Sequence, residues 1–191
     1  KAVVADTLES IESYKFKDLE KPAPKKGQVL IRVAACGVGY VDALVALGGY
    51  QVKPPLPHTP GREVAGTVDA VGEGVTNVKP GDRVMTMTAN GFAEYALAPA
   101  AMVIPVPQTL SFAEAASLPL NYLTVSHGLK DRAALAAGET VLIFGAAGGV
   151  GSAAIQVAKA LGARVIAAAS TEEKRAFALA HGADEAIDTD P

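Results

Sequence analysis

The stretch that decides the fold is VLIFGAAGGVGSAAIQVAKALGARVIAAA, residues 141–169. It opens with four apolar residues, the length of a buried parallel strand, and a glycine-rich turn follows at 145–151. Apolar residues then recur at helical spacing up to Gly162, and a second apolar run closes the stretch. A strand–turn–helix–strand unit of about 30 residues is the kind of unit that binds a dinucleotide.

We expect the glycine-rich turn to bind a pyrophosphate, because glycines let the backbone approach it and the helix start offers free N–H groups. Glycine-rich strings also form ordinary tight turns, but here the string lies between a strand and a helix, and a second strand follows. In the fingerprint G-x-G-x-x-G, Ala146 replaces the first glycine, which is tolerable if Gly145 supplies the freedom for the turn. The residues assigned to the cofactor in this turn are Gly145, Ala146, Ala147, Gly148, Gly149, Val150 and Gly151.

The composition indicates a globular protein without the charge balance of a nucleic-acid-binding protein. Half of the 191 residues are apolar and the net charge is −3. The single cysteine, Cys36, excludes an internal disulfide and a multi-cysteine zinc site, and it fits a reducing cytosol. The sequence shows no leader-like segment and no apolar run of membrane-spanning length. We therefore expect a cytoplasmic protein with no nucleic-acid partner and no membrane partner.

Residues 1 to about 110 are predicted to be rich in short strands, which indicates a small, partly open barrel. A short helix is expected at Tyr40–Leu47, and Pro54–Pro60, with four prolines in seven residues, is expected to be a loop. The predicted strands are Ala2–Ala5, Val29–Ala35, Val64–Val71, Arg83–Met87, Phe92–Ala98 and Met102–Val106.

After Pro107 the sequence becomes rich in alanine and leucine. We predict helices at Phe112–Leu118, with Ser111 as N-cap, at Tyr122–Ala134 and at Thr171–His181, and a third strand at Glu185–Asp188. Only the first three strands of a doubly wound sheet can then be present, and the first strand would keep one unpaired, apolar edge. We therefore expect a fragment or a truncated form of a longer protein, or half of a fold that another chain completes.

Six stretches occur in an order that resembles a known family: CGVGYVDALVALGGY, PGREVAGTVDAVGEGV, KPGDRV, GFAEYA, EAASLPLNYLTV and GAAGGVG. The chain is similar to the medium-chain dehydrogenase/reductase superfamily, in its zinc-free quinone oxidoreductase branch. The resemblance implies an α/β protein with a GroES-like, β-rich catalytic domain at residues 1–119. The first half of a Rossmann domain would follow at residues 120–191, and a full-length parent could form a homodimer.

The resemblance also bears on metal binding. Zinc-dependent relatives use a cysteine and a histidine where this sequence has Gly39 and Arg62, and the four-cysteine zinc loop is absent from the sequence. A cationic Arg62 would repel zinc, which takes protein ligands from cysteine, histidine and carboxylate. We therefore expect no metal site, and we interpret Cys36 as a small core residue on a strand.

The missing ligands point toward reduction of activated double bonds. A Lewis acid supplies several kcal/mol for removing a proton from an alcohol near neutral pH. A quinone or conjugated enone already accepts hydride at carbon and places the charge on a distant oxygen, so hydrogen bonds and water suffice. The expected reaction is therefore hydride transfer to a small-molecule quinone or α,β-unsaturated carbonyl.

The residues near the second strand favour NADPH as cofactor. Ser170 lies about 20 residues beyond the turn, where an NAD site carries an acidic residue. Lys174 and Arg175 follow in the next helix and could meet a 2′-phosphate, although a capped, solvated basic face is the alternative. By resemblance, Asn121 and Thr124 lie near the nicotinamide ribose, but both could equally be helix-capping groups.

The resemblance assigns catalytic roles to three residues. Tyr50 matches a tyrosine that lines the substrate pocket, and Tyr40 and Asp42 lie in the segment beside the nicotinamide; for Tyr40 a core position is the alternative. His58, His127 and His181 have no mutual spacing that indicates a metal or relay site, so we interpret them as structural. Two other functions stay open: an enoyl-thioester reductase module and a non-catalytic NADPH-binding fragment.

Overall fold

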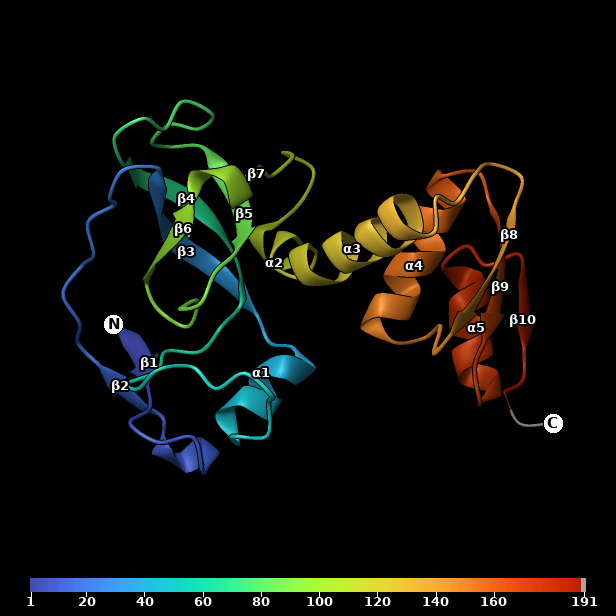
Figure 1. The fold of residues 1–191 in the computed structure, drawn as a ribbon, viewed down its shortest axis with the longest axis horizontal. Helices are drawn as coiled ribbons and strands as arrows, with labels where there is room; N and C mark the ends of the chain where they lie inside the picture. Colours follow the sequence, from blue (N-terminus) through green and yellow to red (C-terminus); the bar gives the residue numbers. More distant parts are fainter. Residues whose placement is uncertain (190–191) are drawn as a thin grey trace. The chain divides into compact units, whose positions relative to one another are not determined.

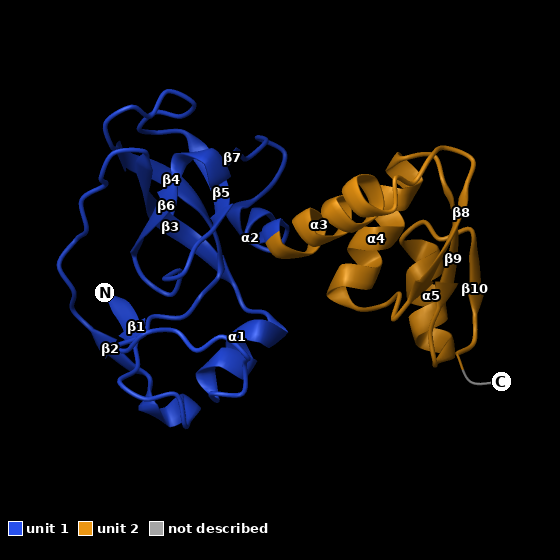
Figure 2. Ribbon diagram, in the orientation of Figure 1, with its two compact units in different colours: residues 1–119 blue, residues 120–191 orange. Residues whose placement is uncertain are grey.

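The computed structural model describes residues 1–189 of the chain. It divides into two compact units, one formed by residues 1–119 and the other starting at Leu120 (Figure 2). The first unit is built around an antiparallel sheet, and the second around a parallel sheet with helices. The expected fold class, a β-rich unit followed by the first half of a doubly wound α/β fold, is confirmed.

The first unit is organised on a five-stranded antiparallel sheet with the order β6-β3-β4-β5-β7 (Figure 1). Its apolar core comes from alternate residues of the central strands, among them Val29, Ile31 and Val64, because side chains along a strand point to opposite faces. The strands are β3 (Gln28–Gly37), β4 (Glu63–Val71), β5 (Arg83–Met87), β6 (Tyr95–Pro99) and β7 (Ile104–Pro105).

The structure departs from the predicted strands most at three places. The strand predicted from Phe92 begins only at Tyr95, because Phe92 instead bonds the backbone of Val3 and Pro60. The strand predicted from Met102 is shorter because Met102 closes a 3₁₀ turn, Ala100–Met102. A small hairpin of β1 (Ala2–Val4) and β2 (Lys15–Lys17) adds a strand that the sequence pattern did not predict.

The helices of the first unit are short. A 3₁₀ turn forms at Ile11–Ser13, α1 is Tyr40–Ala46 and α2 is Phe112–Ala115. The predicted N-cap of α2 is confirmed, because the Ser111 hydroxyl accepts the Glu114 N–H and the Glu114 carboxylate accepts the Ser111 N–H. This reciprocal pair fixes where the helix starts.

The second unit carries a three-stranded parallel sheet with the order β10-β9-β8, joined by α4 and α5 (Figure 1). A helical region precedes it, consisting of α3 (Pro119–Ser126) and a π-helical turn (His127–Arg132) instead of the single predicted helix. The remaining elements are β8 (Thr140–Phe144), α4 (Gly149–Ala160), β9 (Arg164–Ala168), α5 (Glu172–Ala180) and β10 (Glu185–Ile187).

Among residues 1–189, the strand β8 has the free edge that the sequence predicts for a first strand, and the apolar side chains of one of its faces are exposed. Within residues 1–189, β8 pairs only with β9. On β8, Leu142 is 46% exposed and Phe144 71% exposed, whereas Ile143, between them, packs into the core beneath α4. The sheet thus shows the 3-2-1 half of the doubly wound strand order.

Candidate functional site

The glycine-rich turn after β8 has the backbone that its sequence requires. Gly145 takes a left-handed conformation, with φ of +61°, and its carbonyl accepts the N–H of Gly148 at 2.9 Å. Ala146 is fully buried, and its N–H donates to the carbonyl of Ala168 at 3.4 Å. Ala146 therefore fits where the fingerprint has glycine, because the neighbouring Gly145 supplies the left-handed residue.

The last glycine of the turn allows α4 to pack close to β8. A Cβ atom at Gly151 would lie 2.3 Å from the Gly145 carbonyl oxygen, so only glycine fits there. The N-cap, Gly148, has no side chain to bond the first-turn N–H groups of α4. These N–H groups and the positive end of the helix dipole favour an anion at this point.

A pocket of about 410 Å³ lies beside the turn in the second unit and unites it with the end of β9. Ser170 and Lys174, both exposed, belong to its lining, so the structure brings them next to the turn. The lining residues are Gly145, Ala147, Gly148, Ala168, Ala169, Ser170, Lys174 and Thr189. This arrangement can hold a diphosphate at the helix start and a further phosphate near Lys174.

Arg175 is placed differently from Lys174. Its Nη1 donates to the Ala169 carbonyl at 2.9 Å and to the Asp188 carboxylate at 2.7 Å, and its side chain is mostly buried. Arg175 is not among the residues that line the pocket. The sequence offers Lys174 and Arg175 as equal candidates for the 2′-phosphate, but in the structure they differ. Lys174 lines the pocket, whereas Arg175 links α5 by hydrogen bonds to the residues that follow β9 and β10.

Asn121 lies against the start of α4. A Cβ atom at Gly149 would lie 3.0 Å from Asn121 Nδ2, so the amide directly faces the turn. Both Asn121 and Thr124 are inside α3, which spans Pro119–Ser126, and neither occupies a cap position. Neither residue therefore caps its own helix. Thr124 is exposed on the same helix.

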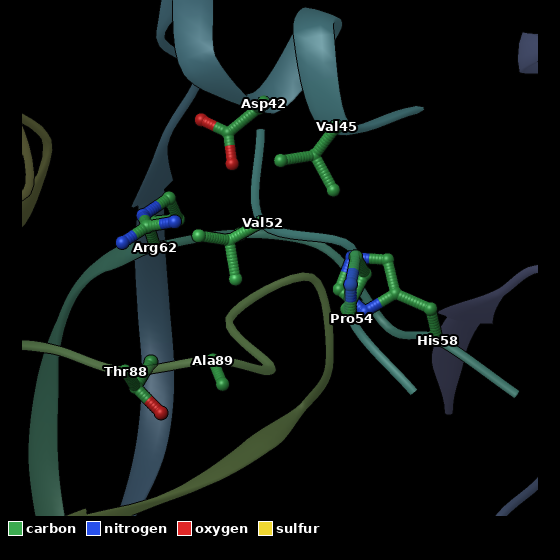
Figure 3. Close-up of a pocket in the computed structure, with 9 residues that line it drawn as sticks. Asp42, Val45, Val52, Pro54, His58, Arg62, Thr88 and Ala89 are labelled. Carbon is green, nitrogen blue, oxygen red and sulfur yellow. The ribbon is translucent and has the colours of Figure 1, made fainter. Parts of the chain in front are cut away.

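The first unit contains a second pocket, of about 150 Å³, beside α1 (Figure 3). Asp42 and Val45 reach it from α1, Arg62 from the segment before β4, and Thr88 and Ala89 from the segment after β5. The residues that line it are Asp42, Val45, Val52, Pro54, His58, Gly61, Arg62, Thr88 and Ala89.

The three residues predicted to be catalytic occupy different positions relative to this pocket. Asp42 is buried in its wall, and its Oδ2 accepts the Gly39 N–H at 2.9 Å. The ring of Tyr50 lies under the guanidinium of Arg62, 5.9 Å from centroid to Cζ. Tyr40 starts α1 but is 79% exposed and does not line the pocket, so the alternative of a core position for Tyr40 is wrong.

Two titratable groups near this pocket are shifted by burial. Burial lowers the pKa of His58, and the negative charge of Asp42 partly opposes that shift. Burial, reinforced by the charge of Asp42, raises the pKa of the Cys36 thiol to about 12. Cys36 lies on β3 and packs against the core of the sheet, as expected. At neutral pH the imidazole of His58, in the pocket lining, and the thiol of Cys36, outside that lining, are therefore both uncharged.

The other two histidines make local contacts in the second unit. His127 Nδ1 lies 3.1 Å from Asp131 Oδ2, and His181 stacks on Phe177 at the end of α5. Over residues 1–189, the structure brings no three histidine, cysteine or acidic side chains together in a group that could hold a metal ion. In the same range, no helix is both long and apolar enough to span a membrane.

Sequence reasoning missed three residues of the pocket beside α1. Arg62 was considered only as a residue unfavourable to zinc, His58 only as structural, and Thr88 was not singled out. The proline-rich segment 54–60 is the one feature of the sequence that points to this pocket. In the structure its residue His58 exchanges backbone hydrogen bonds with Ala5, the residue after β1. That pairing depends on residues more than 50 positions apart, which local patterns do not show.

Comparison with known proteins gives consistent matches along the chain. The family model of the alcohol dehydrogenase GroES-like domain matches residues 25–108, and that of zinc-binding dehydrogenase matches residues 149–191. Quinone oxidoreductase of Sus scrofa is 48% identical over 170 residues, which are 88% of this chain and 52% of that protein. The chain spans about half the length of the curated relatives it matches.

Solved structures support the same assignment. The quinone oxidoreductase of Thermus thermophilus, solved also as a complex with NADPH, aligns with a TM-score of 0.83 at 38% identity, over 98% of this chain and 59% of that one. The CurK enoyl reductase aligns with a TM-score of 0.89 at 32% identity, over 100% of this chain and 60% of that one. The chain belongs to the medium-chain dehydrogenase/reductase family, in its quinone oxidoreductase branch.

Proposed function

We propose that the complete protein is an NADPH-dependent reductase that transfers hydride to a small-molecule quinone or α,β-unsaturated carbonyl. The observation that carries this proposal is the pocket in which the glycine-rich turn, Ser170 and Lys174 meet. The similarity to quinone oxidoreductases, one of them solved with NADPH, supports it. Residues 1–119 would act as the catalytic domain and residues 120–191 as part of the cofactor domain.

The residues present fit NADPH. The unbonded N–H groups at the start of α4 suit the diphosphate, and Gly151 lets the backbone come close enough. Ser170 stands where an acidic residue would bind the ribose hydroxyls of NADH, and a carboxylate there would repel a 2′-phosphate. Lys174, on the pocket wall, supplies the positive charge. Asn121, next to Gly149, and Thr124 would contact the nicotinamide half.

When bound, NADPH supplies a hydride, so the chain's own residues need only orient the acceptor and accommodate charge. Asp42, Tyr40 and Tyr50 are proposed to position the acceptor, and water or a ribose hydroxyl to deliver the proton. Gly39 and Arg62 replace zinc ligands of relatives, so we propose that no metal takes part. The cytoplasmic location and the homodimer remain predictions.

An enoyl-thioester reductase is the second candidate, and the similarity to the CurK enoyl reductase favours it. The two candidates share the cofactor and the direction of hydride transfer. They differ in the acceptor, which is a free quinone or enone in one case and a thioester in the other. A fragment that binds NADPH without catalysis is the third alternative, and it would show binding without turnover.

The test is a comparison of acceptors with the complete protein. NADPH consumption is measured with benzoquinone, methyl vinyl ketone and crotonyl-CoA, and NADP⁺ reduction is measured with ethanol. We expect turnover with the quinone or the enone and none with ethanol. Turnover with crotonyl-CoA alone would support the second candidate. Turnover with ethanol, or no turnover with any acceptor despite NADPH binding, would contradict the proposed reaction.

A further inference from the structure

We propose that Arg62 binds the carbonyl oxygen of the acceptor and stabilises the negative charge that this oxygen gains during hydride transfer. The inference rests on the proposed function and assigns an electrostatic role in it to a residue of the pocket beside α1. Arg62 is the lining residue of this pocket that carries a permanent positive charge. A group that stabilises charge formed only in the transition state accelerates the reaction itself.

The other polar residues of the lining cannot supply that charge. Asp42 is an acceptor, and one of its oxygens already binds the Gly39 N–H. The Thr88 hydroxyl donates to the Leu97 carbonyl at 2.9 Å, so toward a ligand it can only accept. Burial holds the pKa of His58 low, so its imidazole is neutral at neutral pH. The remaining lining side chains are apolar or absent.

The position of Arg62 leaves part of its donor capacity unused. Its Nε is buried and has no hydrogen-bond partner among the described residues. A buried donor without a partner is unfavourable. The guanidinium that carries the charge is part of the pocket lining, so an acceptor oxygen in the pocket would meet it. The ring of Tyr50, whose centroid lies 5.9 Å from Arg62 Cζ, is within reach of a cation–π contact with the guanidinium. Tyr50 would then act on the acceptor through Arg62, as a positioning residue.

The electron balance of the step shows why a cation helps. The acceptor carbon gains the hydride that NADPH loses, and an electron pair of the conjugated system moves to the carbonyl oxygen. That oxygen carries the negative charge of an enolate until water supplies a proton. An enolate from an enone takes this proton at the α-carbon and becomes the saturated ketone, whereas the adduct of a quinone is protonated on oxygen and loses the added ring hydrogen as a proton to become the hydroquinone.

The first test compares Arg62→Met and Arg62→Lys with the complete wild-type protein. Methionine keeps the apolar length and removes the charge, and lysine keeps the charge without the planar guanidinium. We expect kcat with benzoquinone to fall roughly 10²-fold in Arg62→Met and less in Arg62→Lys, as for the loss of one oxyanion donor. KM for NADPH should not change. Arg32→Met, an exposed arginine of β3 outside the pocket, is the matched control and should keep wild-type kcat.

The second test needs no turnover. Nitrophenol, whose ionised form absorbs visible light, imitates the oxyanion of the reduced acceptor. Bound to the wild-type protein, it should ionise at lower pH than in water, and in Arg62→Met this shift should disappear. A wild-type protein that reduces quinone, with unchanged kcat and nitrophenol ionisation in Arg62→Met, would overturn the role of Arg62. An Arg62-dependent shift in a protein that reduces no acceptor would support anion binding by Arg62 and contradict the proposed function instead.

Discussion

A side chain at Gly151 would collide with the carbonyl oxygen of Gly145, because a Cβ atom there would lie 2.3 Å from that oxygen and 2.7 Å from the Cα of Ala146. Both contacted atoms belong to the backbone, which has little room to move. The contact holds the first turn of α4 against the end of β8. It is also where the backbone is proposed to meet the cofactor diphosphate.

We therefore expect Gly151→Ala to destabilise the protein by about 1–3 kcal/mol, the usual range for overpacking, and to weaken NADPH binding. Thermal unfolding and fluorescence titration with NADPH measure the two effects. Gly128→Ala is the matched control, because a Cβ at Gly128 meets nothing within 4 Å. Equal unfolding midpoints for the two variants would contradict the packing argument.

Lys174 and Arg175 should respond differently to removal. Lys174→Ala should raise the Kd for NADPH roughly 10- to 100-fold, the effect of losing one charge-assisted hydrogen bond, and leave the Kd for NADH unchanged. Arg175→Ala should weaken both cofactors alike, because Arg175 bonds Ala169 and Asp188 rather than lining the pocket. The exposed Lys130→Ala serves as control. If Arg175→Ala instead weakened the binding of NADPH and not that of NADH, Arg175 rather than Lys174 would be the residue that binds the 2′-phosphate.

The pKa of His58 makes a prediction for acid stability. Burial lowers this pKa in the folded protein, while in the unfolded chain the ordinary value of 6.5 applies. The unfolded state therefore binds more protons once the pH falls below that value, so stability is lost as the pH falls through the folded pKa. When the pH is lowered from about 8 to about 5, the midpoint of thermal unfolding should therefore fall less in His58→Gln than in the wild type. His127→Gln, with an exposed side chain, should keep the wild-type dependence; a full acid drop in His58→Gln would contradict this assignment.

Cys36 should be unreactive in the folded protein. Burial and the charge of Asp42 raise its pKa from 9.0 to about 12, and each unit lowers the thiolate fraction tenfold. We expect its reaction with dithiodipyridine near neutral pH to be about 10³-fold slower than in the urea-unfolded chain. Because the sequence contains one cysteine, the absorbance change reports this residue alone. Equal rates in the two states would show that the thiol is not shielded.

Local patterns predicted much of the fold. The bounds predicted for β5, Arg83–Met87, agree with the structure, and the turn after β8 lies where its glycines indicated. The hairpin strand β2 was missed because its sequence, Lys-Phe-Lys, offers one apolar side chain, and Phe16 is 83% exposed instead of buried. Strands held mainly by backbone pairing leave little trace in hydrophobic periodicity.

The candidate site was predictable in its cofactor half and less so in its acceptor half. Ser170 and Lys174 are close to the turn because a βαβ unit always returns its second strand beside the first. The pocket beside α1 is formed by segments distant in sequence, so Arg62 could not be placed next to Tyr50 and Asp42 from spacing alone. Arg175 was indistinguishable from Lys174 by sequence because its partner, Asp188, follows 13 residues later.

The most direct measurement is a calorimetric comparison of 2′-phospho-AMP with AMP as ligands of the complete protein. These two molecules differ only in the phosphate that Ser170 and Lys174 are proposed to bind. We predict that 2′-phospho-AMP binds roughly tenfold tighter or more, as one charge-assisted hydrogen bond requires, and that Lys174→Ala removes most of the difference. Equal affinities for the two ligands in the wild-type protein would contradict the assignment of NADPH to this pocket.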